Sequence, residues 1–489
     1  MSRRRAPAAQ LTATTRPPAR RVVAVVLAAG QGKRLRSARP KVMHEVCGRP
    51  SLWHVLRAAR GARPSRIVIV VRQGRAEIEE AVRSWGLAPE VVFVDQGEPL
   101  GTGHAVMAAE PATDGFDEVV VLAGADPLVT ADHVRRLVGA HRRTDAAATL
   151  LATHVPDPRG YGRVVRRGSE LVEIAEETDA SPEIRAIDEV AALAYAFRRA
   201  DLVAALPGIT RETRQREYYL HHVFPILQAR GERVSVVEVD MGGALGFDSR
   251  DGLANVVGIM RRRIVAEHMG NGVTFVDPTT AYVDVDVRIG ADTVVEPLTF
   301  LQGATRVGAA CRIGPSTRLV DTAVGDGAEV TFAVARGARI GAEARVGPFA
   351  SLRPGTVLAA GAKAGTFVEL KNARVGRGSK VPHLAYVGDA EIGEHVNVGA
   401  GTITCNYNGY EKHRTVIGDE AFIGSDTMLV APVRVGKRAW TGAGSAIVND
   451  VPPGALAVER SEQRHVRGYD ERKRAAHGGR PPGGSRAGQ

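Results

Sequence analysis

The sequence predicts two domains of different architecture: an α/β domain with a Rossmann-like, mostly parallel sheet, followed by a left-handed parallel β-helix of hexapeptide repeats. In the first half of the 489-residue chain, continuous aliphatic runs alternate with segments of helical spacing. In the second half, apolar residues recur every six positions, often with glycine after them. The length itself favours two or more domains.

The first half begins with a buried strand and a glycine loop. Residues 22–27, VVAVVL, form an unbroken aliphatic run, as expected for a parallel strand buried on both faces. A helix is predicted at residues 51–62, and further buried strands at residues 66–71, 91–94 and 119–124. Ligands in such sheets bind at the carboxyl ends of strands, where Gly30 and Gly124 lie.

The segment VVVLAGADPL, residues 119–128, ends a predicted strand with an acid where a metal-binding carboxylate is common. Gly124 lets the backbone approach a ligand, but Ala125 follows it directly and the acid comes one residue later, at Asp126. In an extended chain, a one-residue shift turns a side chain to the opposite face. The alternatives of a metal ligand and a solvated turn residue before Pro127 both stay open.

The second half begins after a long helix predicted at residues 251–268. Beyond it the aliphatic residues lie six apart, as in Ile289, Val295, Leu301, Val307, Ile313 and Leu319, and the pattern returns from Ile340 and from Ile417. This period is typical of a parallel β-helix in which three hexads make one triangular coil. The segment CNYNGYEKHRT, residues 405–415, interrupts the period and predicts a loop on the binding face.

The charge distribution excludes a broad nucleic-acid groove. Of the net charge of +11, residues 1–21 carry +6 and residues 459–489 carry +4, so the folded part is close to neutral. The two tails read as solvated and flexible, with weak polyanion binding as the alternative. Three widely spaced cysteines argue against a disulfide framework and fit a reducing cytoplasm. No signal-peptide run or membrane-spanning stretch is present in the sequence.

An α/β half followed by a hexapeptide β-helix resembles the bifunctional N-acetylglucosamine-1-phosphate uridyltransferase/glucosamine-1-phosphate acetyltransferase family of bacterial cell-wall precursor synthesis. The most specific matches are RPGT, VELKNA, HLAYVGDAEIGEHVNVGAGTITCNYNG and GSDTMLVAPV. The resemblance covers residues 21–460 and implies a homotrimer, with the acetyltransferase site built between subunits. It divides the chain into a disordered basic tail (1–20), a nucleotidyltransferase domain (21–250), a helical linker (251–272), a β-helix acetyltransferase domain (273–458) and a basic C-terminal tail (459–489).

Acetyl transfer to an amine needs a base, an anchor for the acceptor and a cradle for coenzyme A. The resemblance implies that His383 is the general base, in place of a histidine merely stacked in a coil corner. It implies that glucosamine 1-phosphate is held by Arg353, Lys371, Tyr386 and Asn397. For acetyl-CoA it points to Ala400, Asn406, Tyr407, Ser425, Ala443 and Arg460. Lys412, in the interrupting loop, either reaches the ligand or is solvated.

Uridyl transfer from UTP to N-acetylglucosamine 1-phosphate depends on positioning and on charge neutralisation by Mg²⁺. The segments LAAGQGKRLRS and PKVMHEV resemble the family's nucleotide loop and phosphate ligand, although no P-loop spacing is present. The resemblance implies that UTP and the sugar are bound by Leu27, Ala28, Ala29, Gly30, Lys41, Gln96, Gly101, Thr102, Gly162 and Glu176.

Several positions of this half depart from the family's pattern. Ala125 stands at the usual metal aspartate, Asp248 at the second metal ligand, which is normally asparagine, and Lys33 at a usual threonine. Ala191 and Leu193 replace the sugar-binding asparagine and a glycine, and His221-His222 replaces Thr-Asp. Asp126 and Asp248 together are the candidate Mg²⁺ ligands, provided that the turn at Gly124 redirects Asp126.

Three functions are therefore compared. The first is the full bifunctional enzyme of UDP-N-acetylglucosamine synthesis, with an altered first half. The second is an acetyltransferase whose nucleotidyltransferase domain is catalytically degenerate. The third, a sugar-nucleotide pyrophosphorylase with a structural β-helix, is disfavoured because a structural helix has no need of His383 or of the Asn406-Tyr407 loop. A changed nucleotide or sugar specificity is also compatible with Ala191 and Leu193.

Overall fold

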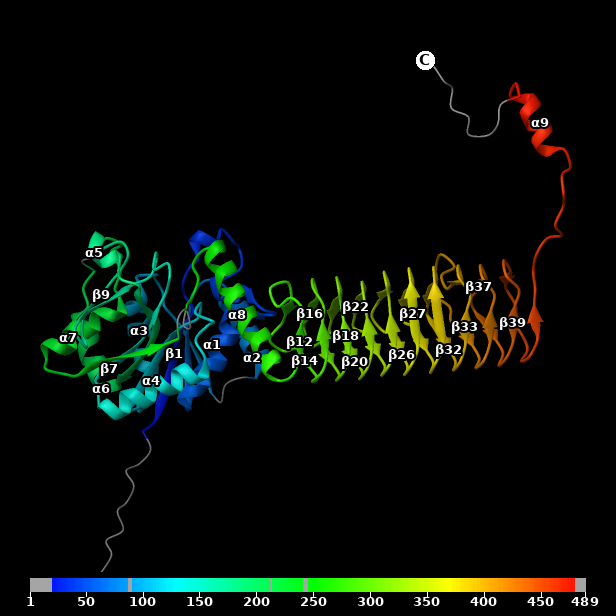
Figure 1. Cartoon of the computed structure of the whole chain (residues 1–489). Helices are drawn as coiled ribbons and strands as arrows, with labels where there is room; N and C mark the ends of the chain where they lie inside the picture. Colours follow the sequence, from blue (N-terminus) through cyan, green and yellow to red (C-terminus); the bar gives the residue numbers. More distant parts are fainter. Residues whose placement is uncertain (1–19, 87–89, 212, 241–244, 480–489) are drawn as a thin grey trace, which may run out of the picture. The chain divides into compact units, whose positions relative to one another are not determined.

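The computed structural model describes residues 20–86, 90–211, 213–240 and 245–479. The predicted basic segment 1–20, apart from Arg20, and residues 480–489 of the C-terminal tail lie outside the described residues. The chain forms two compact units (Figure 1). The first runs to Gly270 and takes in Tyr282–Val287, and the second comprises Asn271–Ala281 and the chain from Arg288 onward.

The first unit is built on a mixed sheet whose central strands are parallel. Its order is β11-β7-β10-β6-β1-β4-β5, with β8 and β9 paired beside β10. Strands β1, β4, β5 and β6 run parallel to one another, and β10 runs antiparallel between β6 and β7. The strands are β1 (Val22–Leu27), β4 (Arg66–Val71), β5 (Val91–Asp95), β6 (Glu118–Ala123), β7 (Ala148–His154), β8 (Arg163–Arg167), β9 (Glu170–Ala175), β10 (Glu189–Arg198) and β11 (Val234–Val239).

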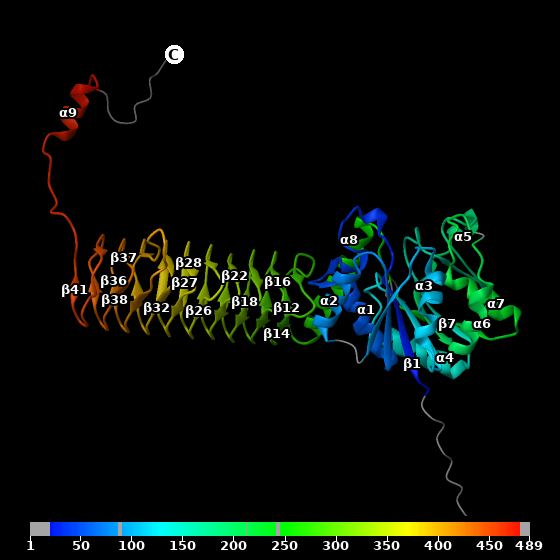
Figure 2. The same cartoon turned by 180° about the vertical axis from the view of Figure 1, so that it is seen from behind.

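Helices cover both faces of this sheet, because alternate residues of each strand point to opposite sides. Val22, Ala24 and Val26 pack into one apolar core and Val23 and Val25 into the other. The first core is closed by α1 (Ser51–Ala59), α2 (Arg75–Trp85) and α4 (Ala131–Thr144). The second is closed by α3 (Thr102–Ala109), α6 (Arg199–Ala205) and α7 (Val223–Ala229), and Figure 2 shows this arrangement from behind.

Helix α8 (Arg250–Gly270) belongs to the first unit, and its Val256 joins the first core. At 21 residues it is the longest helix of the described chain, yet it carries charges throughout. Across the described ranges, no helix combines the length and apolarity that crossing a membrane requires.

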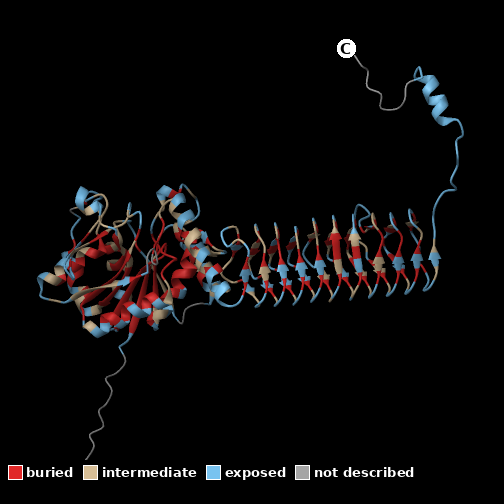
Figure 3. Ribbon diagram, in the orientation of Figure 1, coloured by how far each residue is buried: buried red, intermediate tan, exposed pale blue. Residues whose placement is uncertain are grey.

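The second unit is a parallel β-helix of three sheets with 11, 10 and 9 short strands, from β12 (Thr274–Phe275) to β41 (Leu456–Ala457). Each strand pairs in parallel with the third strand along the chain, as β27 (Lys363–Thr366) does with β30 (Lys380–His383), so three strands complete one coil. The aliphatic residues spaced six apart point inward, and Figure 3 shows a buried interior with exposed outer faces. The predicted α/β and parallel β-helix architectures are thus confirmed.

One corner of the β-helix carries a column of exposed apolar side chains. Leu298, Phe332, Phe349, Phe367 and Leu384 all occupy the left-handed backbone region and are exposed. Backbone hydrogen bonds such as Phe349 N to Phe332 O (2.8 Å) hold successive corners in line, and the Phe349 and Phe367 rings stack with centroids 5.3 Å apart. Stacked exposed aromatics of this kind are typical of an interaction surface.

Candidate functional site

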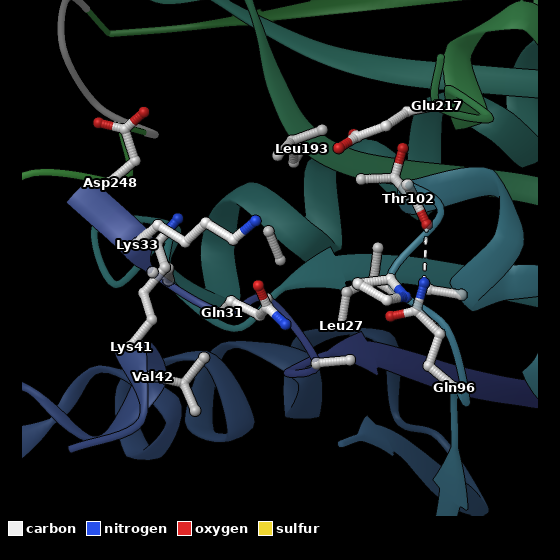
Figure 4. A pocket seen from close by; sticks show the side chains of 18 of the residues that line it. Leu27, Gln31, Lys33, Lys41, Val42, Gln96, Thr102, Leu193, Glu217 and Asp248 are labelled. Carbon is white, nitrogen blue, oxygen red and sulfur yellow. Dashed lines mark hydrogen bonds between the residues drawn. The ribbon is translucent and has the colours of Figure 1, made fainter. Parts of the chain in front are cut away.

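The first cavity, of about 400 Å³, opens at the carboxyl ends of β1 and β6. Figure 4 shows Lys33, Lys41 and Asp248 at one end of it and Gln96 and Thr102 at the other. Residues predicted to bind UTP that line it are Leu27, Ala29, Gly30, Lys41, Gln96, Gly101 and Thr102. Ala28 is buried beside them and donates its backbone N–H to Val70 O (2.8 Å).

The far end of this cavity is shaped by hydrogen bonds. The Gln96 amide donates to Gly101 O (3.0 Å), which holds the side chain at the cavity wall. Thr102 Oγ1 accepts a hydrogen bond from Leu220 N (3.0 Å), which connects helix α3 to the segment just before α7. Gly101 has φ +107°, and a Cβ there would lie 2.6 Å from Tyr218 O, so only glycine fits this turn.

The turn after β6 brings both Ala125 and Asp126 to the same cavity. Gly124 N still donates to Leu27 O (2.9 Å), but Asp126 N then donates to Ala123 O (3.1 Å), so the chain turns immediately. In an extended strand, a shift of one residue moves a side chain to the opposite face, but this rule does not apply within the turn. Asp126 is 8% exposed and lines both this cavity and the next one, so it is not a solvated turn residue.

The segment carrying Asp248 lies directly against Asp126. Phe247 N donates to Ala125 O (3.1 Å), and a Cβ added at Gly246 would lie 1.8 Å from Asp126 Oδ1. Asp126 and Asp248 therefore line the same cavity and both act on Lys41, although they lie far apart in the sequence.

Each carboxylate has a cationic neighbour. Burial raises the pKa of Asp126 to about 7, and Lys41 and the Leu193 N–H oppose the rise. Burial also lowers the pKa of Lys41, against the attraction of Asp126 and Asp248. Arg34 Nη1 pairs with Asp248 Oδ2 at 2.6 Å. Phosphate groups that enter this end of the cavity would contact Lys33, Arg34 and Lys41. The Asp126 and Asp248 carboxylates would then be available to bind a hard cation. The donor set, two carboxylates in a cavity that also holds Lys33, Arg34 and Lys41, fits a divalent metal bound together with phosphate groups.

The second cavity, of about 550 Å³, shares Lys41, Asp126, Leu193 and Asp248 with the first. Gly162 and Glu176, predicted to bind the sugar, line it together with Ala191 and His221. Because Ala191 has no amide and Leu193 fills space, the wall they form is less polar than the family's pattern implies.

His221 faces Glu176 across this second cavity. Its Nδ1 lies 3.7 Å from Glu176 Oε1, and its ring stacks on Tyr219 at 5.3 Å. Burial raises the pKa of Glu176 to about 7, helped by Asp179 and Glu217, and burial lowers the pKa of His221 to about 3. At neutral pH His221 is therefore uncharged and can act as a neutral hydrogen-bonding group in this cavity.

The predicted acceptor and base residues of the β-helix lie on two of its sheets. Glu369 on β28 (Glu369–Lys371) is opposite Tyr386 on β31 (Tyr386–Gly388). Arg353 follows β25 (Ser351–Leu352), and its guanidinium donates a hydrogen bond to Glu369 Oε1 (3.0 Å). The backbone N–H of Arg353 donates to Leu370 O. His383 ends β30 at the corner that leads into β31, and it is exposed. Asn397, on β33 (Asn397–Val398), is opposite Lys380 on β30, in a different sheet from the one that contains β25, β28 and β31.

The residues predicted to bind acetyl-CoA fall into two groups. Ala400, Ser425 and Ala443 line up at corners of successive coils, as the bonds from Asp426 N to Ala400 O and from Gly444 N to Ser425 O show. Asn406 and Tyr407 open the interrupting loop after β34 (Ile403–Cys405), with Asn406 buried and Tyr407 exposed. Arg460 is exposed just after the last coil.

Some residues at these sites were not singled out from the sequence. Arg34, Tyr161 and Glu217 line the cavities of the first unit. The adjacent cations in GQGKR were the only sequence signal for Arg34. A separate cluster has side chains close enough together to bind a metal, namely His154, Glu189 and Glu238. Arg166 donates hydrogen bonds to both of these glutamates and balances their charge.

Comparison with known proteins gives one consistent family. A model of the MobA-like NTP transferase domain matches residues 24–219. "Bifunctional protein GlmU" of Desulfitobacterium hafniense (strain DSM 10664 / DCB-2) is 44% identical over 452 residues, covering 92% of this chain and 99% of the relative. The proteins of the same name from Mycolicibacterium gilvum (strain PYR-GCK) and Mycobacterium tuberculosis (strain ATCC 25177 / H37Ra) are 48% and 46% identical, each covering 92% of both chains.

Proposed function

This chain belongs to the family of bifunctional GlmU proteins, and we propose how its two units divide the two steps of UDP-N-acetylglucosamine synthesis. We assign acetyl transfer from acetyl-CoA to glucosamine 1-phosphate to the β-helix domain at residues 273–458. We assign uridyl transfer from UTP to N-acetylglucosamine 1-phosphate to the domain at residues 21–250. The observation that carries this assignment is the placement of the matched residues on two sheets of the β-helix and around two cavities that share lining residues.

In the β-helix, the proposed acid–base group is His383. Its position at an exposed corner leaves the imidazole able to take the ammonium proton of the acceptor. The freed amine attacks the thioester carbonyl, the C–N bond forms, the C–S bond breaks, and coenzyme A leaves as the thiol once it is protonated. Arg353 and Lys371 hold the acceptor phosphate, for which Arg353 exchanges its pairing with Glu369.

In the first unit, Lys33, Arg34 and Lys41 are proposed to hold the triphosphate, and Asp126 and Asp248 to hold Mg²⁺. The metal, when bound, neutralises charge that develops on the phosphate oxygens. The sugar-phosphate oxygen attacks the α-phosphorus, and pyrophosphate leaves with the electron pair of the broken P–O bond. Arg34 and Lys41 then pair with phosphate oxygens, which releases Asp248 and Asp126 from their present cationic neighbours.

A homotrimer is proposed from the exposed corner column of Leu298, Phe332, Phe349, Phe367 and Leu384. The column ends beside His383, so a partner chain packed on it would lie next to the acceptor site. Asn397 lies in a different sheet from the strands beside Arg353, which fits a site completed by a second chain. We propose a cytoplasmic location because the co-substrates, UTP and acetyl-CoA, are cytoplasmic and the three cysteines are free.

The second candidate is an acetyltransferase with a degenerate first unit. It is favoured by Ala125 in the phosphate cavity and by the apolar wall of Ala191 and Leu193. The deciding measurement is Mg²⁺-dependent pyrophosphate release from UTP and N-acetylglucosamine 1-phosphate, with acetyl-CoA consumption on glucosamine 1-phosphate in parallel. Pyrophosphate release at a rate near acetyl transfer supports the bifunctional enzyme, whereas acetyl transfer alone supports the second candidate.

A further inference from the structure

Within the segment that interrupts the β-helix period, residues 406–414 form a loop between β34 and β35. Most of its hydrogen bonds lie within the loop, and few join it to the coils. Asn408 Oδ1 accepts bonds from Tyr410 N (2.9 Å) and Glu411 N (2.7 Å), and Asn408 N bonds Glu411 O. Tyr407 and Lys412 form an isolated bridge between the two arms. These bonds fix the shape of the loop but leave its placement to the residues at its base.

Both ends of this loop converge on one residue, Asp389. At the start of the loop, the Asn406 amide donates to Asp389 Oδ2 (2.5 Å). At its end, Thr415 N, the first residue of β35 (Thr415–Ile417), donates to the Asp389 backbone carbonyl (3.2 Å). Arg414 also pairs with Glu391, two residues after Asp389.

Asp389 also joins the loop to the coil that carries Lys371. Its other oxygen, Oδ1, accepts from the amide of Asn372 (2.7 Å), the residue after Lys371, and its backbone N–H donates to Lys371 O (3.0 Å). The pKa of the Asp389 carboxyl lies below its usual range: burial opposes the change, while hydrogen bonds from Asn372 and Asn406 and the charges of Lys371 and Lys412 favour it. The carboxylate is therefore ionised and saturated by two amide donors at neutral pH.

The charge of Asp389 balances two neighbouring ammonium groups. Lys412 of the loop lies against Lys371, whose contact and charge lower the pKa of Lys412, while Asp389 raises it. Like charges repel, and the Asp389 carboxylate offsets part of this repulsion at Lys412.

We propose that Asp389 is a positioning residue for acetyl transfer, which holds the interrupting loop and its predicted coenzyme A ligands on the coil that carries the predicted acceptor-phosphate ligand. This role rests on the proposed function of the β-helix. The proposal goes beyond that function because the placement of Asn406, Tyr407 and Lys412 then depends on the Asp389 carboxylate, which is not assigned a contact with either substrate.

The test is Asp389→Asn. Asparagine tolerates the left-handed backbone of this corner, φ +49°, so the coil itself is preserved. One amide oxygen cannot accept from both Asn372 and Asn406, and the new NH₂ group faces a donor. Loss of a charge-assisted hydrogen bond predicts a fall of about 10- to 100-fold in kcat/KM for acetyl-CoA. KM for glucosamine 1-phosphate is expected to stay constant or fall, because a negative charge beside Lys371 is removed.

The matched control is Asp321→Asn. Asp321 occupies the same kind of corner with φ +48° and bonds Ala304 N (2.8 Å), but it lies coils away from His383 and from the loop. The control is expected to keep wild-type kinetics. Hydrogen exchange at residues 406–414 supplies a second readout and is expected to accelerate in Asp389→Asn alone.

Three outcomes would overturn the role of Asp389: kinetics within twofold of wild type in Asp389→Asn, an equal rise in both KM values, or the same loss in Asp321→Asn. If Asp389→Asn does not fold, Asn372→Ala removes one donor and keeps the carboxylate, and faster exchange in the loop is then the deciding result. A wild-type protein without acetyl transfer would count against the proposed function instead, and the exchange measurement would still decide whether Asp389 anchors the loop.

Discussion

Replacing Asp126 by asparagine is expected to stabilise the first unit above neutral pH and to abolish its uridyl transfer. Asp126 is buried in the wall of the cavity proposed to hold the triphosphate, with Lys41 as its charged neighbour. A desolvated carboxylate is costly when no metal is bound, and asparagine of the same shape removes that cost. Lys41 keeps Asp248 as an attractive neighbour in the variant.

The magnitude follows from the pKa. Burial raises the pKa of Asp126 from 3.8 to about 7. The unfolded chain loses this proton above about pH 4, while the folded chain keeps it until about pH 7, so the free energy of unfolding falls as the pH rises through that window. At 1.36 kcal/mol for each pKa unit, the full difference is about 4 kcal/mol. In a domain of this size it corresponds to roughly 10 °C in Tm.

The assay compares Tm of the first unit in wild type and Asp126→Asn from pH 4.5 to 8. The difference between the two proteins cancels the titration of the buried histidines, and it is expected to grow from about a quarter of its full size at pH 4.5 to nearly its full size at pH 7.5. Mg²⁺ with UTP is expected to raise Tm of the wild type more than that of the variant. A Tm difference that does not change with pH would refute the desolvation argument, and equal stabilisation by Mg²⁺ and UTP would refute the role of Asp126 in metal binding.

Three further changes separate the two activities. His383→Ala is expected to lower kcat of acetyl transfer by about 10²- to 10⁴-fold without changing pyrophosphate release, and loss of both activities would instead indicate misfolding. Phe349→Asp places a charge in the exposed corner column and is expected to convert trimer to monomer, measured by light scattering, with loss of acetyl transfer; an unchanged trimer would exclude this face. Ala125→Asp supplies a second carboxylate in the phosphate cavity and is expected to raise Mg²⁺-dependent pyrophosphate release at least about tenfold, whereas no change would mean that Asp126 and Asp248 already suffice.

The β-helix could be predicted almost residue by residue, because its backbone repeats. Every sixth aliphatic residue must point inward, so Val307, Ile313 and Leu319 are buried as the spacing predicts. The loop at residues 405–415 was visible as the break in this period. The role of Asp389 was not visible, because a Gly-Asp pair at a coil corner recurs without a loop above it, as at Gly325-Asp326.

The first unit was less predictable, because its site is made of turns and of strands that are distant in sequence. The parallel strands β1, β4, β5 and β6 were expected from their aliphatic runs. The antiparallel strand β10 has an apolar run at residues 190–197, but this run is rich in alanine, which is not a strong strand former. Its pairing with β7 shifts register between Ala191 and Tyr195, and it brings Leu193 to the cavity. The pairing of Arg34 with Asp248, 214 positions apart, depends on tertiary folding alone.

The two sites differ in how much sequence drift they can absorb, and the reason is local backbone geometry. After β6 the chain turns at once, so Ala125 and Asp126 reach one cavity, and a carboxylate displaced by one residue still faces the phosphate end. On the β-helix, His383 lies exposed at the corner between Pro382 and Leu384, so a shift by one residue would exchange the proposed base for an apolar side chain. Altered residues can accumulate around the turn while the site keeps its charge, whereas the coil corner tolerates no such displacement. This difference explains how Ala125 can depart from the family's pattern while Asp126 still supplies a carboxylate to the cavity.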